Sequence, residues 1–436
     1  MKTVAFYTLG CKVNQYETEA MSELFQKAGY TEVEAEEVAD VYVINTCTVT
    51  SLSDKKSRQF IRRSRRNNEN AIIAVVGCYS QISPDEVKKI EGVNLILGTN
   101  ERKLIVEFVE DLASFEQVVK VEDIMSVSEF EELEIENVKG RTRAFLKIQE
   151  GCNQYCTYCI IPYARGKIRS RKLENIQKEA QRLSGNGFKE IVLTGIHVAS
   201  YGKDLENATL LDAIKLVHEI DGIERIRLSS VEPRLMSDEF LNGIAALPKV
   251  CHHFHMSLQS GCDTILKKMN RKYTTEEYFD IVQKIKTVLP NSALTTDVIV
   301  GFPQETDEEF QTTLEFVEKV GFSKVHVFKY SPREGTPAAK MEGQVHPDKK
   351  SERSQKLIAL AEKLEKDFLN QFVGKEMNVI FETDFAKGTG QIEGFTDNYI
   401  KVVADGSNEL FGNMKKVKII SSENEILLGK ITELGL

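Results

Sequence analysis

The sequence predicts an α/β protein built from more than one domain. Its 436 residues exceed the length of one ordinary domain, and 41% of them are hydrophobic, which is enough for sizeable cores. Through most of the chain, apolar runs alternate with amphipathic helical segments, a pattern typical of parallel sheets covered by helices. After residue 375 the pattern changes to short alternating runs separated by Gly, Asp and Asn. This pattern of short alternating segments is typical of a small all-β barrel.

Residues 1–112 predict an N-terminal domain with a parallel sheet. Apolar or aromatic residues recur every four positions from Tyr16 to Ala28, so they line one face of a helix. Residues 49–66 indicate a second helix, which is strongly basic. The expected strands are 3–9, 41–46, 71–76 and 93–97. Because helical segments separate these strands, we expect them to run parallel.

A strongly acidic segment follows, and we expect residues 113–138 to form a solvated connector. From Glu107 to Glu136 the chain has eleven acidic residues and one lysine, a net charge of −10. The whole chain carries −9, so the remainder carries +1. The acidity is therefore local and does not exclude a polyanionic partner elsewhere on the molecule.

Residues 139–371 predict six βα repeats, which form a partial or complete α/β barrel. The expected strands are 143–149, 190–194, 225–229, 253–257, 294–300 and 324–328. A long helix is expected at residues 351–370. Residues 372–436 then form the small β-barrel domain.

Composition also indicates the compartment. The chain has no run of 18 or more apolar residues, which argues against a membrane span. Its first residues lack the long apolar core of a secretory signal, so we expect a cytoplasmic protein. Because cytosolic thiols are kept reduced, the eight cysteines indicate metal or redox chemistry more than disulfides.

Cys152, Cys156 and Cys159 form a C-x3-C-x2-C motif just after the first predicted barrel strand. Three thiolates at this spacing can hold three irons of a 4Fe-4S cluster, which leaves the fourth iron open to a small ligand. The alternatives are a zinc site or cysteines without a ligand role. Structural zinc sites, however, prefer four protein ligands.

Cys11, Cys47 and Cys78 each come one or two residues after the end of a predicted strand. The carboxyl ends of parallel strands lie along one edge of a sheet, where ligands bind. We therefore expect these thiols to converge on a second cluster site. The alternative is three separately buried cysteines, because free Cys is often buried.

The remaining cysteines and the histidine group show weaker patterns. Cys251 and Cys262 have no motif around them and are expected to be ordinary thiols. His253 and His255 share one strand face, but two ligands alone make a weak metal site. We expect these histidines to pack or hydrogen-bond near the active site.

On these motifs the sequence resembles the radical S-adenosylmethionine methylthiotransferases. The segment CNQYCTYC after a strand is similar to the radical enzymes, and the other three cysteines and the β domain are similar to the methylthiotransferases, whose C-terminal domain is an OB-like TRAM domain. LGCKVNQYET (9–18) most resembles the subgroup that modifies N6-threonylcarbamoyladenosine at tRNA position 37. The isopentenyladenosine enzymes usually carry a GCQMN-like segment there, and the ribosomal-protein enzymes carry GCPKN.

The resemblance implies a partial (β/α)6 radical core and two 4Fe-4S clusters. Cys152, Cys156 and Cys159 would hold the radical cluster, and the three N-terminal cysteines an auxiliary cluster. S-adenosylmethionine would serve both as the source of a 5′-deoxyadenosyl radical, which takes hydrogen from C2 of the adenine, and as the methyl donor. The auxiliary cluster would deliver sulfur. A reducing electron donor and a sulfur source are further implied partners.

The resemblance also implies cofactor-binding positions at the carboxyl ends of the barrel strands. These are Tyr158, Thr194, Gly195, Ser229, Glu232, Asp297 and Gly301.

Two basic groups near the predicted clusters fit phosphate contacts with a tRNA loop. They comprise Lys55, Lys56, Arg58, Arg62, Arg63, Arg65, Arg66, Arg165, Arg169 and Arg171. A single-stranded loop lowers the cost of unstacking the target base.

Three functions compete. The first is transfer of a methylthio group to C2 of N6-threonylcarbamoyladenosine in tRNA. The second is the same chemistry on N6-isopentenyladenosine or on a ribosomal-protein aspartate. The third is a non-catalytic iron–sulfur protein that binds RNA as a sensor.

Overall fold

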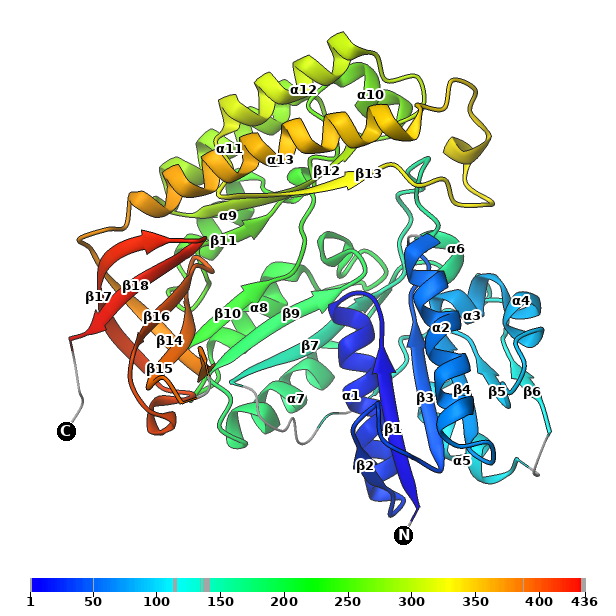
Figure 1. Ribbon diagram of the computed structural model, residues 1–436. Helices are drawn as coiled ribbons and strands as arrows, with labels where there is room; N and C mark the ends of the chain where they lie inside the picture. The colour runs from blue at the N-terminus through cyan, green and yellow to red at the C-terminus, as the bar shows by residue number, and fades with distance from the viewer. Residues whose placement is uncertain are drawn as a thin grey trace.

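The computed structural model describes residues 2–49, 51–112, 116–133, 135, 142–386 and 388–432, without the side chains of residues 51 and 52. The polypeptide forms a blue-to-cyan N-terminal sheet domain, a green-to-yellow central α/β unit and an orange-to-red β-barrel (Figure 1). The predicted connector 113–138 falls partly outside the described residues, at 113–115, 134 and 136–138. Among the described helices, none combines the length and apolar character needed to cross a membrane.

The N-terminal domain is a parallel sheet with strand order β2-β1-β3-β4-β5-β6. The four predicted strands are confirmed; they are β1 (Thr3–Thr8), β3 (Val41–Thr46), β4 (Ile72–Gly77) and β5 (Leu95–Leu97). The helices are α1 (Lys12–Lys27), α2 (Ser51–Asn67), α3 (Cys78–Ile82), α4 (Pro84–Lys88) and α5 (Ile105–Glu110). Sequence patterning missed β2 (Thr31–Val33) and β6 (Val118–Lys120) because each has only three residues and is largely exposed.

The expectation of a solvated acidic connector is wrong for part of the segment. Strand β6 pairs with β5, and Ile124, Glu131 and Leu133 are buried. Glu131 accepts hydrogen bonds from Arg102 at 2.7 and 2.9 Å, so an internal cation compensates its charge. Part of the connector therefore packs at the interface between the two domains that it links.

The central unit confirms the six predicted strands and the open barrel. Its strands are β7 (Arg143–Glu150), β9 (Glu190–Gly195), β10 (Arg225–Leu228), β11 (His253–His255), β12 (Ala293–Val300) and β13 (Lys324–Lys329). Two parallel groups, β7-β9-β10 and β11-β12-β13, are linked by isolated bridges such as Val231 to Met256. The short strand β8 (Arg169–Ser170) pairs antiparallel with β7 at the outer edge.

Helices cover the outside of this barrel (Figure 1). They are α7 (Leu173–Gly185), α8 (Leu210–His218), α9 (Asp238–Ala245), α10 (Asp263–Lys268), α11 (Thr275–Val288), α12 (Asp307–Val320) and α13 (Pro347–Asn370). The short helix α6 (Ile161–Arg165) instead lies against α3 of the N-terminal domain. Helices α8, α11 and α12 each begin with a capping box. Their apolar faces and the strands form the largest hydrophobic core.

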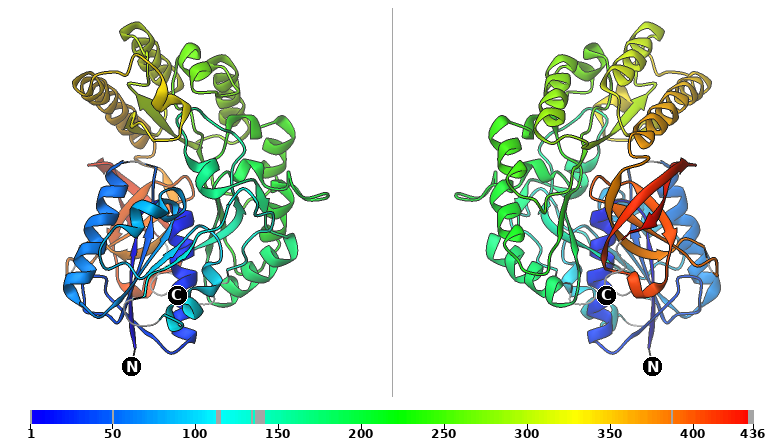
Figure 2. Two further views of the ribbon diagram at one scale, coloured as in Figure 1. Left: turned by 90° about the vertical axis from the view of Figure 1, so that its right-hand side faces the viewer. Right: turned by 90° about the vertical axis from the view of Figure 1, so that its left-hand side faces the viewer.

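The C-terminal domain is a closed barrel with strand order β14-β15-β16-β18-β17, as predicted. The strands are β14 (Glu376–Asp384), β15 (Gln391–Thr396), β16 (Lys401–Asp405), β17 (Met414–Glu423) and β18 (Ile426–Ile431). Two buried arginines of β10 dock it: Arg225 donates to the carbonyls of Phe395 and Asn378, and Arg227 donates to that of Asp397. The barrel thus lies beside the open side of the core (Figure 2).

Candidate active site

All six motif cysteines line one cavity of 1120 Å³ at the carboxyl ends of the strands. Cys11, Cys47 and Cys78 follow β1, β3 and β4 directly, because the sheet brings these three strand ends to one edge. The remaining three lie in the loop between β7 and α6 and are Cys152, Cys156 and Cys159. Two parts of the chain that are remote in sequence therefore supply three thiols each to a shared space.

Glycines allow the N-terminal cysteine loops to approach one another. Gly10 has a φ of +116°, and a Cβ there would lie 2.9 Å from Cβ of Cys47. Gly77 has a φ of +96°, and a Cβ there would lie 2.7 Å from the carbonyl oxygen of Thr46. A side chain at either position would separate these loops, so the glycines before Cys11 and Cys78 allow the cysteines to converge.

None of the eight cysteines forms a disulfide in the structure. Within the described residues, no three Cys, His, Asp or Glu side chains converge tightly enough for a single metal ion. A 4Fe-4S cluster does not require such convergence, because each of its thiolates binds a different iron atom. Cys251 and Cys262 are buried and do not line the cavity, which agrees with an ordinary structural role.

Burial shifts the thiols of the site toward their protonated form. It raises the pKa of Cys78 and of Cys159 to about 12, and that of Cys152 to about 11. Neighbouring cysteines of the same set add to each shift. Because thiolates are the metal ligands, loading such a site must release protons.

Arg165 connects the two sets of cysteines. It ends α6, shortly after the C-x3-C-x2-C loop, and its Nε donates a hydrogen bond to Sγ of Cys78 at 3.2 Å. The same guanidinium donates to Glu17 at 2.5 Å and to Asn14 at 2.7 Å on α1. Although burial opposes its charge, Cys78 and the two carboxylates of Glu17 and Glu150 raise the pKa of Arg165.

This arginine belongs to a buried ion cluster between the domains. Glu17 also pairs with Arg102 at 2.5 Å and with Lys147 at 3.0 Å. Burial opposes the charge of Glu17, but these three cations outweigh it and hold the pKa of the carboxyl below its usual range. The N-terminal domain and the radical core are thereby joined by charges that cannot separate without leaving uncompensated partners.

A second arginine contacts the other cysteine set. Arg271 donates from Nη1 to Sγ of Cys156 at 3.4 Å and from Nη2 to the carbonyl of Ser257 at 3.4 Å. Sequence reasoning gave no signal for Arg271, because it lies over a hundred residues from the motif and is brought to it only by the fold.

Five of the predicted cofactor positions line the cavity, namely Tyr158, Thr194, Gly195, Ser229 and Asp297. Glu232 lies just behind the wall, where it accepts from Gln154 at 3.2 Å and lies 3.5 Å from His197. Gly301 is not among the lining residues, and its role in cofactor binding stays a prediction. Its N–H donates to Glu305 at 2.7 Å, and its Cα faces Lys350.

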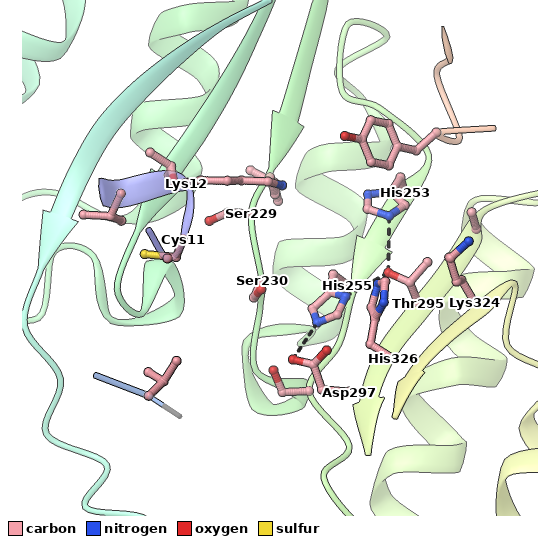
Figure 3. A pocket seen from close by; sticks show the side chains of 18 of the residues that line it. Cys11, Lys12, Ser229, Ser230, His253, His255, Thr295, Asp297, Lys324 and His326 are labelled. Carbon is pink, nitrogen blue, oxygen red and sulfur yellow. Dashed lines mark hydrogen bonds and ion pairs between the residues drawn. The ribbon is translucent and has the colours of Figure 1, made fainter. Parts of the chain in front are cut away.

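A polar wall of the cavity comes from β11, β12 and β13, whose side chains point inward in Figure 3. His255 lies 3.3 Å from Asp297 and 3.0 Å from Thr295. His253 contacts Thr295 through Nε2 at 3.3 Å, as the second dashed line shows. The histidines thus form hydrogen bonds at the site, as expected, and the sequence did not indicate that His326 would join them.

Two family profiles match the chain. The radical SAM superfamily matches residues 146–317, which cover the C-x3-C-x2-C loop and the strands after it. The uncharacterized protein family UPF0004 matches residues 3–98, which carry the other three cysteines.

Full-length relatives settle the family. The chain is 47% identical to threonylcarbamoyladenosine tRNA methylthiotransferase MtaB of Bacillus subtilis, over 97% of this chain and 94% of that protein. It is 41% identical to the protein of the same name from Thermotoga maritima, over 98% and 96%. The chain belongs to the radical S-adenosylmethionine methylthiotransferase family. A tRNA-2-methylthio-N(6)-dimethylallyladenosine synthase of Clostridium botulinum is also similar, at 38% identity over 97% and 95%.

The solved structures show the fold of this methylthiotransferase more distantly. The radical S-adenosylmethionine methyltransferase TsrM of Kitasatospora setae, in a structure with cobalamin and a 4Fe-4S cluster bound, covers 90% of this chain with a TM-score of 0.57. The sequences are 15% identical, so the likeness concerns architecture alone.

The structure divides the residues that were predicted to contact RNA. On α2 of the methylthiotransferase, Lys55, Lys56, Arg62, Arg63 and Arg66 are exposed. Several of them line a groove of 1210 Å³ together with Lys89. Arg58 is half-buried against Tyr79, and Arg65 is held by the carbonyls of Glu69 and Gly92. One cationic face therefore remains on this helix.

The prediction of phosphate contacts is wrong for Arg165, Arg169 and Arg171. Their exposed fractions are 0%, 1% and 2%, so a phosphate in solution cannot reach them. Arg171 instead pairs with Glu132 at 2.7 Å and with Glu179. A basic run in the sequence does not reveal which of its charges the fold will neutralise.

Proposed function

We propose that this methylthiotransferase transfers a methylthio group to C2 of N6-threonylcarbamoyladenosine at position 37 of tRNA. The observation that carries the proposal is the shared cavity, which is lined by two sets of three cysteines, one from each domain. A sensor needs clusters but no common cavity between them. Transfer of sulfur to a carbon activated by a radical needs both groups to reach one substrate atom.

The residues present fit the cofactors of the family. Cys152, Cys156 and Cys159 would hold the radical cluster, and Cys11, Cys47 and Cys78 the auxiliary cluster. Oγ of Ser229 is buried at the cavity and has no hydrogen-bond partner in the described structure, which suits a ligand hydroxyl such as that of a ribose. When bound, the two clusters and S-adenosylmethionine supply the radical, the sulfur and the methyl group.

The chain's own residues position and shield this chemistry. Arg165 and Arg271 each donate to one cysteine sulfur of a different set, which fixes those side chains and stabilises negative charge on sulfur. The aromatic ring of Tyr158 packs beside Cys262 and Phe302, so it forms a rigid wall between the cysteine loop and the barrel. The C-terminal barrel covers the open side through Phe395 and Tyr399, which limits access of water.

The exposed cations of α2 would hold the tRNA backbone while the base enters the cavity. Helix α2 begins four residues after Cys47, so phosphate contacts in its first turns, at Lys55 and Lys56, would lie nearest to the auxiliary site. We further propose that the protein works in the cytoplasm, with a reducing electron donor and a sulfur source that renews the auxiliary site.

Deletion of the gene, in a strain without a second such enzyme, tests this function. We expect mass spectrometry of tRNA nucleosides to show loss of the 2-methylthio derivative and accumulation of N6-threonylcarbamoyladenosine. Re-expression of the wild-type chain should restore the product, and re-expression of Cys156→Ala should not. Persistence of the derivative in the deletion strain would contradict the assignment.

A further inference from the structure

The cavity contains one lysine that the described structure leaves without a counterion. Lys12 is the first residue of α1, directly after Cys11, and its half-buried side chain lines the cavity. In Figure 3 it lies on the side facing the histidine wall. Within the described part of the chain, Lys12 has no ion pair and no hydrogen bond.

The charged residues around Lys12 do not neutralise its ammonium group. Tyr399 and Glu190 attract its charge, Arg227 and Arg143 repel it, and Glu190 is the one carboxylate among its principal electrostatic neighbours. Glu190 is already bound, since Arg227 lies 2.6 Å from it and Arg225 lies 3.7 Å from it. By contrast, the other two lysines that line the cavity are paired. Lys324 pairs with Glu365 at 2.8 Å and with Glu425 at 3.2 Å, and Lys401 pairs with Glu393 at 2.8 Å.

An unused hydrogen-bonding group lies in the same region. His253 is 5% exposed, and its Nδ1 is buried without a partner in the described structure. His253 and Lys12 both line the cavity. After burial and Arg227, the charge of Lys12 also lowers the pKa of His253. Burying a polar group without a hydrogen-bond partner costs free energy. A ligand that binds both Lys12 and Nδ1 of His253 would recover that free energy.

The chemistry of the proposed substrate supplies the missing anion. A threonylcarbamoyl group carries a carboxylate and a hydroxyl, whereas an isopentenyl group is apolar. On adenine, C6, which carries N6, and C2 flank N1, so a substituent on N6 that turns toward N1 comes close to C2, the atom that is modified. A carboxylate there would come close to the residue that follows Cys11.

We propose that Lys12 binds the carboxylate of the threonylcarbamoyl group, with His253 as a neighbouring hydrogen-bonding partner, and so selects this base over apolar N6-modified adenosines. The inference rests on the proposed function and deepens it. A charge-assisted contact in a cavity is stronger than one at the surface, which gives Lys12 the means to discriminate.

Binding measurements on the holoenzyme test the inference. The probes are two anticodon stem-loops, one with N6-threonylcarbamoyladenosine and one with its methyl ester, which lacks the negative charge. We expect the wild type to bind the acid about tenfold or more tightly than the ester. Lys12→Gln should abolish this preference by weakening the acid alone, and Lys12→Arg should retain most of it.

Lys324→Gln is the matched control, because it removes a lysine charge from the same cavity that is already paired. It should keep the preference for the acid. Iron content and the visible spectrum establish that Lys12→Gln holds its clusters. If Lys12→Gln loses its clusters, the comparison of the two stem-loops on the wild-type enzyme tests the proposal. Equal binding of acid and ester by the wild type would overturn it.

Two other results would overturn it. Equal weakening of acid and ester in Lys12→Gln would make Lys12 a phosphate or structural contact, and an unchanged preference would remove it from recognition. The proposed function fails separately, when the wild type forms no methylthio product on the acid-bearing tRNA.

Discussion

Nε of Arg165, from the radical core, donates a hydrogen bond to Sγ of Cys78, from the N-terminal sheet, at 3.2 Å. The two residues are 87 positions apart in the sequence. The arginine thereby joins a predicted ligand of the auxiliary cluster to the domain that holds the radical motif. The distance between the two cysteine sets therefore depends on the position of this buried arginine side chain.

Arg165→Lys should weaken both the interface and the auxiliary site. A lysine ammonium cannot donate in the planar geometry that serves Cys78, Glu17 and Asn14 together. We expect a loss of about 3 kcal/mol in the free energy of unfolding, measured by urea denaturation. We also expect a lower reduction potential of the auxiliary cluster, because a hydrogen bond to its sulfur is lost.

Arg333→Lys provides the control for this change. Arg333 also crosses to the N-terminal domain, where it donates to Thr48 at 2.5 Å and to Asp54 at 2.7 Å, but it contacts no cysteine in the described structure. It should affect the stability of the interface and leave the potential unchanged. An Arg165→Lys protein with wild-type stability and potential would show that the contact has no effect.

The two cysteine sets should load independently. Replacing Cys152, Cys156 and Cys159 by Ala should leave one cluster per chain, as should replacing Cys11, Cys47 and Cys78, because each set lies in a different domain. Iron and sulfide content and electron paramagnetic resonance after anaerobic reconstitution measure this. Loss of all iron from a folded triple variant would contradict two separate sites.

The exposed face of α2 should account for much of the salt dependence of tRNA binding. Replacing Lys56, Arg62 and Arg66 by Ala removes exposed charges of the groove beside this helix. The slope of log K against log salt concentration should decrease by about 2 to 3, because each lost phosphate contact contributes about 0.7 to 0.9.

The control for this experiment is Lys356→Ala with Lys363→Ala on α13. These lysines form ion pairs on an exposed face and are absent from both cavities described here. The double variant should preserve the slope. An unchanged slope in the α2 variant would remove that helix from the RNA interface.

Buried carboxylates should confer acid sensitivity, and Glu190 allows a clean measurement. Burial disfavours its charge, but Arg227, Arg143 and Arg225 outweigh burial and lower the pKa of Glu190. The folded state therefore binds fewer protons than the unfolded state, so the stabilisation is complete above the unfolded pKa of about 4.5. It is lost as the pH falls through the folded value.

Glu190→Gln should accordingly destabilise the protein at pH 7, and the difference from the wild type should shrink below about pH 4.5. Urea unfolding from pH 3 to pH 7 measures the difference. A gap that stays constant over this range would mean that the Glu190 charge contributes nothing to stability.

The sequence predicted the parts of this molecule that depend on local pattern. Apolar runs identified the inner strands, and a cysteine after each of three strand ends predicted a shared edge. Strands β2 and β6 escaped because each has only three residues, and one or two apolar positions are too few to form a recognisable run. Sequence patterning does not detect these two strands because they form by pairing with a neighbouring strand.

Charged residues were harder to place than cysteines. Arg165 and Arg62 look alike in the sequence, yet one is buried among carboxylates and the other is exposed on α2. Lys12 was visible only as part of a subgroup motif, and its lack of a counterion emerges from where β10 and the C-terminal barrel lie. Such properties arise from tertiary contacts between segments that are far apart in sequence.

Reconstituted enzyme provides the most direct test of the central claim. The purified chain with both clusters, a reductant and S-adenosylmethionine is incubated anaerobically with tRNA bearing N6-threonylcarbamoyladenosine or N6-isopentenyladenosine at position 37, and the nucleosides are analysed by mass spectrometry. The account predicts the 2-methylthio product on the threonylcarbamoyl tRNA, together with 5′-deoxyadenosine. Formation of 5′-deoxyadenosine without that product, or a methylthio product on the isopentenyl tRNA alone, would contradict it.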